Sequence, residues 1–144
     1  MANTSLDFTT ETRNILDMAI KEAKRLKQDI GPEHILLALI SNGESTAVKA
    51  LSDIGVTPVK VRVATEYIIG YGDRSPDQIR LTPRAKKVLE IAQDEARKEN
   101  KQCGAEHLLL GILLQHESIA AEVLESIAGL DKLREYIRTI ESVK

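Results

Sequence analysis

The block Gly31-Pro32-Glu33-His34-Ile35-Leu36-Leu37-Ala38 returns later in the chain as Gly104-Ala105-Glu106-His107-Leu108-Leu109-Leu110-Gly111. The second block follows the first by 73 residues, and the same offset relates Thr9 to Thr82. Two copies of one structural unit are therefore encoded. Because an apolar run follows each Gly-x-Glu-His start, we expect a largely buried helix at the same place in both copies.

Apolar spacing and capping residues predict four helices in each copy. Proline is tolerated in the first helical turn, where its missing N–H has no partner to lose, and Pro32, Pro58 and Pro83 mark three of the starts. Hydroxyl side chains are predicted to cap three other starts, at Thr9, Ser45 and Ser118. The predicted helices are Thr10–Lys27, Pro32–Ser41, Thr46–Ile54, Pro58–Ile69, Pro83–Asn100, Ala105–His116, Ile119–Ile127 and Asp131–Val143.

The copies are joined by a turn-rich segment without apolar periodicity. We place repeat one at about residues 8–69, the linker at about 70–81 and repeat two at about 82–143. Each copy alone is small for a strongly apolar second helix, so we expect both to close one core within a single domain, residues 1–144. The predicted fold is all-α, with two pseudo-symmetric four-helix repeats forming one eight-helix domain.

Charge and hydropathy exclude several classes of partner. A formal net charge of −2 argues against nucleic acid as the main partner. The run Arg80, Arg84, Lys86 and Lys87 is interpreted as a solvated helix face. No apolar stretch is long enough to cross a membrane and Met1–Asp7 lacks a signal-peptide pattern, so we expect a cytoplasmic protein without a membrane partner.

Residues for catalysis or metal binding are scarce. The sequence has no phosphate-binding Walker loop, no His-Glu-x-x-His and no Gly-x-Ser-x-Gly, so we expect neither an enzyme nor a cofactor in this chain. Cys103 matches Ile30 in the other repeat and is interpreted as a small core residue. His34 and His107 are interpreted as packed at the helix base, with one ring nitrogen bonded to backbone, rather than as metal ligands.

The doubled glutamates Glu33 and Glu106 have two interpretations. A carboxylate in the first helical turn interacts favourably with the positive end of the helix dipole, by about 0.3–1 kcal/mol. A carboxylate at an exposed helix start is also able to receive a guanidinium in a bidentate, charge-assisted pair. The first role is structural, and the second makes each glutamate a docking point.

The Phe8-Thr9 start, the two Gly-x-Glu-His blocks and Leu81-Thr82-Pro83-Arg84-Ala85-Lys86-Lys87 resemble the amino-terminal domain of the Clp AAA+ unfoldases, closest to the ClpC type. The likeness extends from about Phe8 to Ile140. It implies a domain that recruits protein substrates and adaptor proteins to a hexameric ATPase ring, which feeds the ClpP peptidase. ATP would belong to a downstream module of a ClpC-like unfoldase. The alternative is a free-standing Clp N-like regulatory subunit of a Clp protease complex.

The same resemblance assigns roles to individual residues. In some ClpC-type domains the glutamates of both blocks receive phosphoarginine on marked substrates, which corresponds to Glu33 and Glu106 here. ClpC-type blocks usually carry Thr before this Glu, whereas this chain has Pro32 and Ala105, and Pro32 lacks an amide donor. A second family surface, at the start of the fifth helix, corresponds to Leu81, Lys86 and Glu90, with Leu81 standing where Phe is common.

Overall fold

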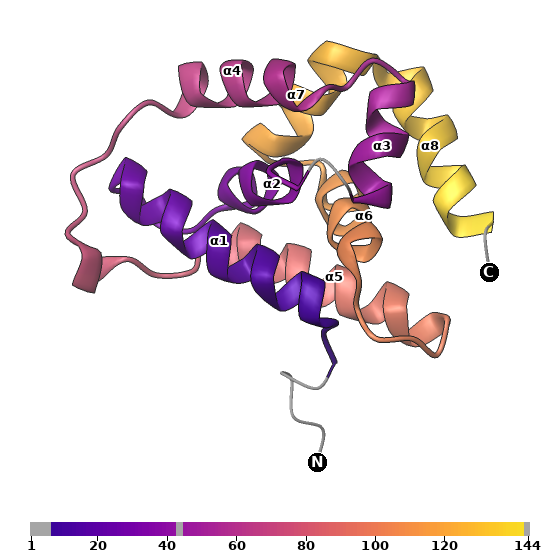
Figure 1. The fold of residues 1–144 in the computed structure, drawn as a ribbon, viewed down its shortest axis with the longest axis horizontal. Helices are drawn as coiled ribbons and strands as arrows, with labels where there is room; N and C mark the ends of the chain where they lie inside the picture. The colour runs from indigo at the N-terminus through magenta and orange to yellow at the C-terminus, as the bar shows by residue number, and fades with distance from the viewer. Residues whose placement is uncertain (1–6, 43–44, 143–144) are drawn as a thin grey trace.

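A computed structural model describes residues 7–42 and 45–142. These residues form eight α-helices and one short 3-10 helix, and they contain no β-strand, only two isolated β-bridges (Figure 1). The elements are α1 (Thr10–Leu26), α2 (Pro32–Ile40), α3 (Thr46–Asp53), α4 (Pro58–Ile69), η2 (Pro76–Gln78), α5 (Pro83–Lys98), α6 (Ala105–Gln115), α7 (Ile119–Ala128) and α8 (Leu130–Ser142).

The helix boundaries confirm the sequence prediction to within two residues. Each predicted hydroxyl cap is made: Thr9 accepts from the Thr12 amide at 3.0 Å, and Ser45 and Ser118 cap α3 and α7. The short helix η2 was not predicted, because it lies in the turn-rich linker, which loops out at one end of the molecule (Figure 1). Val143, the last residue predicted to be helical, lies outside the described residues.

The repeats are tied to each other at their entry segments. Phe8 forms a parallel bridge with Cys103, and Leu81 forms one with Ile30. These two bridges are related by the 73-residue offset, and each joins one repeat to the other. Backbone hydrogen bonds follow the same rule, because the Thr9 amide donates to the Cys103 carbonyl at 3.1 Å and the Thr82 amide to the Ile30 carbonyl at 2.9 Å.

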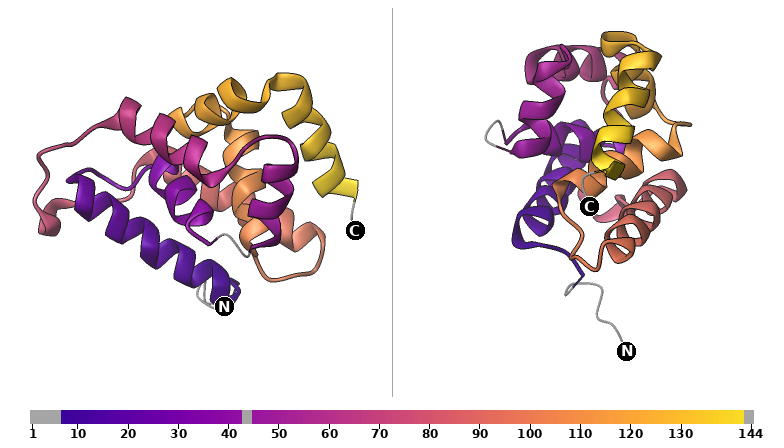
Figure 2. Two further views of the ribbon diagram at one scale, coloured as in Figure 1. Left: turned by 45° about the horizontal axis from the view of Figure 1, so that its top comes forward. Right: turned by 90° about the vertical axis from the view of Figure 1, so that its right-hand side faces the viewer.

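The second helix of each repeat lies at the centre of the molecule. Helix α2 packs against α1 and α4 of its own repeat and against α5, α6 and α7 of the other (Figures 1 and 2). Helix α6 likewise contacts α1 and α3 across the repeat boundary. Their side chains belong to one apolar cluster that both repeats supply. This enclosure explains why both helices are apolar nearly all round.

One pair of matched core positions differs between the repeats. Gly111 of α6 lies where α5 passes closely, and a Cβ added there would lie 2.5 Å from the Val88 carbonyl oxygen. The matching residue of α2 is Ala38, whose methyl group is buried. The α5–α6 pair of repeat two is thus packed through a glycine, whereas the α1–α2 pair accommodates a side chain.

A charge network joins α1 to α4 in repeat one. Arg62 of α4 contacts Glu22 at 3.3 Å and Glu66 at 2.9 Å, and Arg25 of α1 contacts Glu22 at 3.0 Å and Glu66 at 3.4 Å. Burial alone would raise the pKa of Glu22, but hydrogen bonds from the two arginines outweigh burial and lower it. The matching residues of repeat two are Glu95, Lys98, Glu135 and Thr139. The Glu95–Lys98 contact, at 2.8 Å, corresponds to the Glu22–Arg25 contact of repeat one.

Candidate functional site

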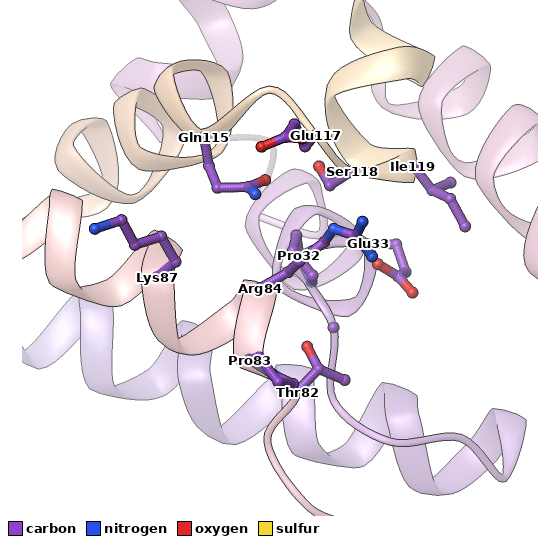
Figure 3. Close-up of a pocket in the computed structure, with 11 residues that line it drawn as sticks. Pro32, Glu33, Thr82, Pro83, Arg84, Lys87, Gln115, Glu117, Ser118 and Ile119 are labelled. Carbon is purple, nitrogen blue, oxygen red and sulfur yellow. The ribbon is translucent and has the colours of Figure 1, made fainter.

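A pocket of about 480 Å³ opens where α2, α5 and α7 begin, next to the end of α6 (Figure 3). Its lining mixes charges of both signs. Glu33 comes from the first turn of α2, Arg84 and Lys87 from the start of α5, and Gln115 from the last turn of α6. The pocket therefore combines residues of both repeats.

The carboxylate in this pocket is partly withdrawn from water. Glu33 is half-buried, and burial raises its pKa above the ordinary glutamate value. Its own backbone amide and the nearby Arg84 act in the opposite direction without cancelling the effect of burial. An ionised Glu33 is thus under-solvated, which favours contact with a positively charged ligand.

The cationic run Arg80, Arg84, Lys86 and Lys87, which begins just before α5, was interpreted as a solvated face, and its four side chains are indeed exposed. The structure adds that two of them, Arg84 and Lys87, line the pocket. Arg84 extends toward the start of α2, where Glu33 lies, whereas Lys87 lies at the edge of the pocket (Figure 3). Their position relative to α2 depends on the packing of the two repeats, so local sequence pattern did not reveal it.

Gln115 brings an unsatisfied polar atom to the pocket. Its Oε1 atom is buried and has no hydrogen-bond partner among the described residues, although its side chain faces the pocket (Figure 3). Buried acceptors are normally paired, so a donor that reached this oxygen after a turn of the Gln115 side chain would satisfy an unpaired group. A guanidinium carries five such donors.

The second predicted glutamate has different surroundings. The Glu106 side chain is 57% exposed at the start of α6, and its Oε1 atom lies 3.5 Å from Nδ1 of His107. The 73-residue offset equates Arg84 with Glu11, Lys87 with Asn14 and Gln115 with Asn42.

The three residues matched to Arg84, Lys87 and Gln115 line a pocket that does not include Glu106. It has a volume of about 490 Å³ and lies between α1 and the end of α2. In it the Asn42 amide donates to the Glu11 carboxylate at 3.3 Å. The position that is cationic in the first pocket is therefore acidic and hydrogen-bonded in the second.

The histidines have the structural role predicted for them. Nδ1 of His34 accepts from the Gly31 amide at 3.0 Å, and Nδ1 of His107 accepts from the Gly104 amide at 2.9 Å. Each ring therefore carries its proton on Nε2, which lies 2.9 Å from the Gln28 oxygen in one repeat and 2.7 Å from the Glu99 carboxylate in the other. Burial lowers the pKa of His34 to about 4, so this ring is neutral at physiological pH.

The cysteine is also confirmed as a core residue. Cys103 is buried, and burial raises the pKa of its thiol to about 12. Within residues 7–42 and 45–142, no group of three His, Cys, Asp or Glu side chains is arranged to hold a metal ion. None of the described helices is both long and apolar enough to span a bilayer.

The predicted adaptor surface lies on and before α5. Lys86 and Glu90 are exposed on one side of this helix, one turn apart, whereas Leu81 is half-buried in its bridge with Ile30. Leu81 therefore contributes to the fold as well as to any contact with a partner.

Sequence reasoning missed an apolar stripe on α4. Val59, Val63 and Tyr67 are 72%, 66% and 90% exposed. Their four-residue spacing places them on one helix face, opposite the buried Val61 and Thr65. This i, i+4, i+8 pattern was visible in the sequence, but apolar side chains on both sides of α4 hid which of them face the core.

Comparison with known proteins places these features in a family. The family model described as the Clp repeat (R) N-terminal domain matches residues 7–127. The chaperone ClpB of Oceanobacillus iheyensis and the negative regulator of genetic competence ClpC/MecB of Bacillus subtilis are each 42% identical to this chain over 133 residues. Each match covers 90% of this chain and 16% of the relative. The chain thus spans less than a fifth of the length of these curated relatives.

Solved structures share the fold. The N-domain of ClpV from Vibrio cholerae matches with a TM-score of 0.77 and 16% identity, over 96% of this chain and 87% of that one. The N-terminal domain of ClpD from Arabidopsis thaliana matches with a TM-score of 0.73 and 23% identity, over 94% of this chain and 95% of that one. A complex of the ClpV N-domain with a VipB peptide matches with a TM-score of 0.73 and 16% identity, covering 96% and 89% of the two chains.

Proposed function

The chain belongs to the Clp N-terminal repeat domain family, and from this membership we propose that it recruits protein substrates and adaptors to a ClpC-like ATP-dependent unfoldase that feeds the ClpP peptidase. The ring and the peptidase are partners reached through the full machine. A related N-domain has been solved with a VipB peptide, which supports a polypeptide ligand for this fold.

The finer part of the proposal is that the ligand includes arginine phosphorylated on its guanidinium. The observation that carries it is the presence of Glu33 and Arg84 in one pocket. The under-solvated Glu33 carboxylate suits the guanidinium nitrogens, and Arg84 suits the phosphoryl oxygens. Pro32 removes one amide that would otherwise face an anion, and the side-chain cation Arg84 supplies the compensating charge.

Adaptors are proposed to use a different part of the surface. Lys86 and Glu90 of α5 offer charges of both signs, and the α4 stripe of Val59, Val63 and Tyr67 offers apolar area. Rim charges steer and orient a partner, whereas buried apolar and aromatic side chains supply most of the affinity.

Binding of a marked polypeptide tests the proposal. Fluorescently labelled β-casein, unmodified or phosphorylated on arginine, is titrated with the purified chain and followed by anisotropy. We expect the modified casein to bind about tenfold more tightly, the size of one charge-assisted hydrogen bond. The double variant Glu33→Gln, Glu106→Gln should lose that preference. Equal affinity of the wild type for both forms would refute the phosphoarginine part, and no binding of either form would refute substrate recruitment by this chain.

A further inference from the structure

The two Gly-x-Glu-His sites are related by the duplication but differ in charge at the residues that surround them. Beside Glu33 lie Arg84 and Gln115, whereas the offset places Glu11 and Asn42 at the corresponding positions of the other site. Helix α5 contacts α2 in the first case and α1 contacts α6 in the second, so the corresponding helices pack against each other at both sites. The two repeats thus share the Gly-x-Glu-His helix start but carry opposite charges at one matched position, which is Arg84 in one repeat and Glu11 in the other.

We propose that the two sites have divided their ligands: the Glu33 pocket accepts a phosphorylated guanidinium, whereas the Glu106 site accepts an unmodified cationic side chain and rejects the phosphorylated one. This inference rests on the proposed recruitment of arginine-marked chains. The two glutamate sites would then not be equivalent: the Glu33 pocket would bind the phosphoarginine, and the Glu106 site would bind a nearby basic residue of the same polypeptide.

Electrostatics supports rejection at the second site. A phosphoryl group at neutral pH carries between one and two negative charges, and it needs a positive partner when it leaves water. At the first site Arg84 provides that partner. At the second site the 73-residue offset assigns the place of Arg84 to Glu11, and α1, which carries Glu11, packs against α6, which carries Glu106. Two carboxylates in place of a carboxylate and a guanidinium would repel the phosphoryl group and attract a plain guanidinium or ammonium.

The amide residues support the same division. The Gln115 oxygen at the first site is buried without a partner among the described residues, so turning the side chain to accept from a ligand N–H would break no hydrogen bond of this oxygen. At the second site the Asn42 amide already donates to the Glu11 carboxylate at 3.3 Å. The first site therefore has an acceptor left to pair, whereas the matching amide of the second site already donates to a carboxylate.

A charge swap between the repeats provides the test. Amide NMR shifts of the isotopically labelled chain are followed while phosphoarginine, L-arginine or inorganic phosphate is added to millimolar concentration. The variants are Arg84→Glu, which imitates the second site, and Glu11→Arg, which imitates the first. Lys132→Glu on α8 is the matched control, because it is exposed, does not line either pocket and changes the net charge as Arg84→Glu does. Thermal unfolding of each variant verifies that it is folded.

For the wild type we expect phosphoarginine to shift amides around Glu33 and Arg84 and to leave those around Glu106 unmoved, whereas L-arginine shifts the Glu106 region. Arg84→Glu should weaken phosphoarginine binding by about tenfold or more, the cost of one charge-assisted pair. Glu11→Arg should create phosphoarginine shifts around Glu106, and Lys132→Glu should change neither site.

The NMR results distinguish a failure of the proposed division between the two sites from a failure of phosphoarginine recognition as such. Phosphoarginine shifts of equal size at both wild-type sites, or at Glu106 alone, would overturn the division while leaving phosphoarginine recognition intact. Shifts at neither site would overturn phosphoarginine recognition itself. Inorganic phosphate binding as tightly as phosphoarginine would show that the first site recognises an anion without the guanidinium, and the division as stated would fall.

Discussion

Glu33 lies half-buried in the first turn of α2 and lines the same pocket as Arg84. Glu106 lies in the first turn of α6, and more than half of its side chain is exposed. The residue that matches Arg84 in the other repeat is Glu11. The backbone around the two glutamates is the same, down to the histidine that accepts from the preceding glycine amide in each repeat. The difference lies in side chains from the partner helices, α5 and α1. Under the proposed division of ligands, the duplicated backbone sets where a ligand binds, and the side chains of the partner helix set which ligand is accepted.

The core shows how far the repeats depend on each other. Leu36 and Leu109 are matched residues of α2 and α6, and both are fully buried. We expect Leu36→Ala and Leu109→Ala each to lower the free energy of unfolding by about 2–5 kcal/mol, because each leaves a cavity in the shared core. Urea unfolding followed by circular dichroism should give one transition for each variant. Two separate transitions in either variant would show that the repeats unfold independently.

Exchanging the residues at the matched positions Ala38 and Gly111 should destabilise the protein in both repeats, for different physical reasons. Gly111→Ala places a methyl group against the Val88 carbonyl and is expected to lower the free energy of unfolding by about 1–3 kcal/mol, despite the better helix propensity of alanine. Ala38→Gly should cost about 1 kcal/mol, mainly through helix propensity. Chemical denaturation measures both. A stabilising Gly111→Ala would mean that α5 moves away from α6 without cost.

The positions of the helices were largely predictable from sequence, because capping hydroxyls, first-turn prolines and apolar spacing act locally. Thr9, Ser118 and Pro83 mark helix starts through interactions within one turn. The pocket was not predictable in this way, since Arg84 and Glu33 lie on different repeats and meet only after α5 packs on α2. The glutamates themselves were found through their duplication, and their unequal burial emerged only from the packed structure.

The α1–α4 network is a smaller difference between the repeats. Glu22→Gln is expected to lower the free energy of unfolding by about 1 kcal/mol, because Glu22 is hydrogen-bonded to Arg25 and Arg62. Glu95→Gln, at the matching position with one such partner, should cost a few tenths of a kcal/mol.

The Glu22 effect should depend on pH with a defined sign. Folding lowers the pKa of Glu22, so its contribution is present above the unfolded value of 4.5 and is lost as pH falls through the lower folded value. Wild type and Glu22→Gln should therefore approach equal stability in acid, as measured by thermal unfolding across this range. A difference that persists unchanged at low pH would assign the effect to packing rather than to charge.

The smallest expected effect decides between the two interpretations of the glutamates. If Glu33 serves mainly to stabilise the start of α2, Glu33→Gln should be destabilising by about 0.3–1 kcal/mol. Burial instead raises the pKa of Glu33, so its ionised form opposes folding at neutral pH. We therefore expect Glu33→Gln to raise the thermal midpoint at pH 7 by an amount equivalent to less than about 1 kcal/mol, and to lose this advantage below pH 4.5, the ordinary value.

Glu106→Gln is the control for Glu33→Gln. Because the Glu106 side chain is 57% exposed, its substitution should change the thermal midpoint little at either pH. A carboxylate that costs stability while empty gains most from a cationic ligand, which restores the favourable surroundings that burial removed. Glu33→Gln should accordingly be the more stable protein and the weaker binder of phosphoarginine, with binding by the wild type strengthening as pH rises through the pKa of Glu33. A variant that is both less stable and equally tight in binding would assign Glu33 to the helix alone.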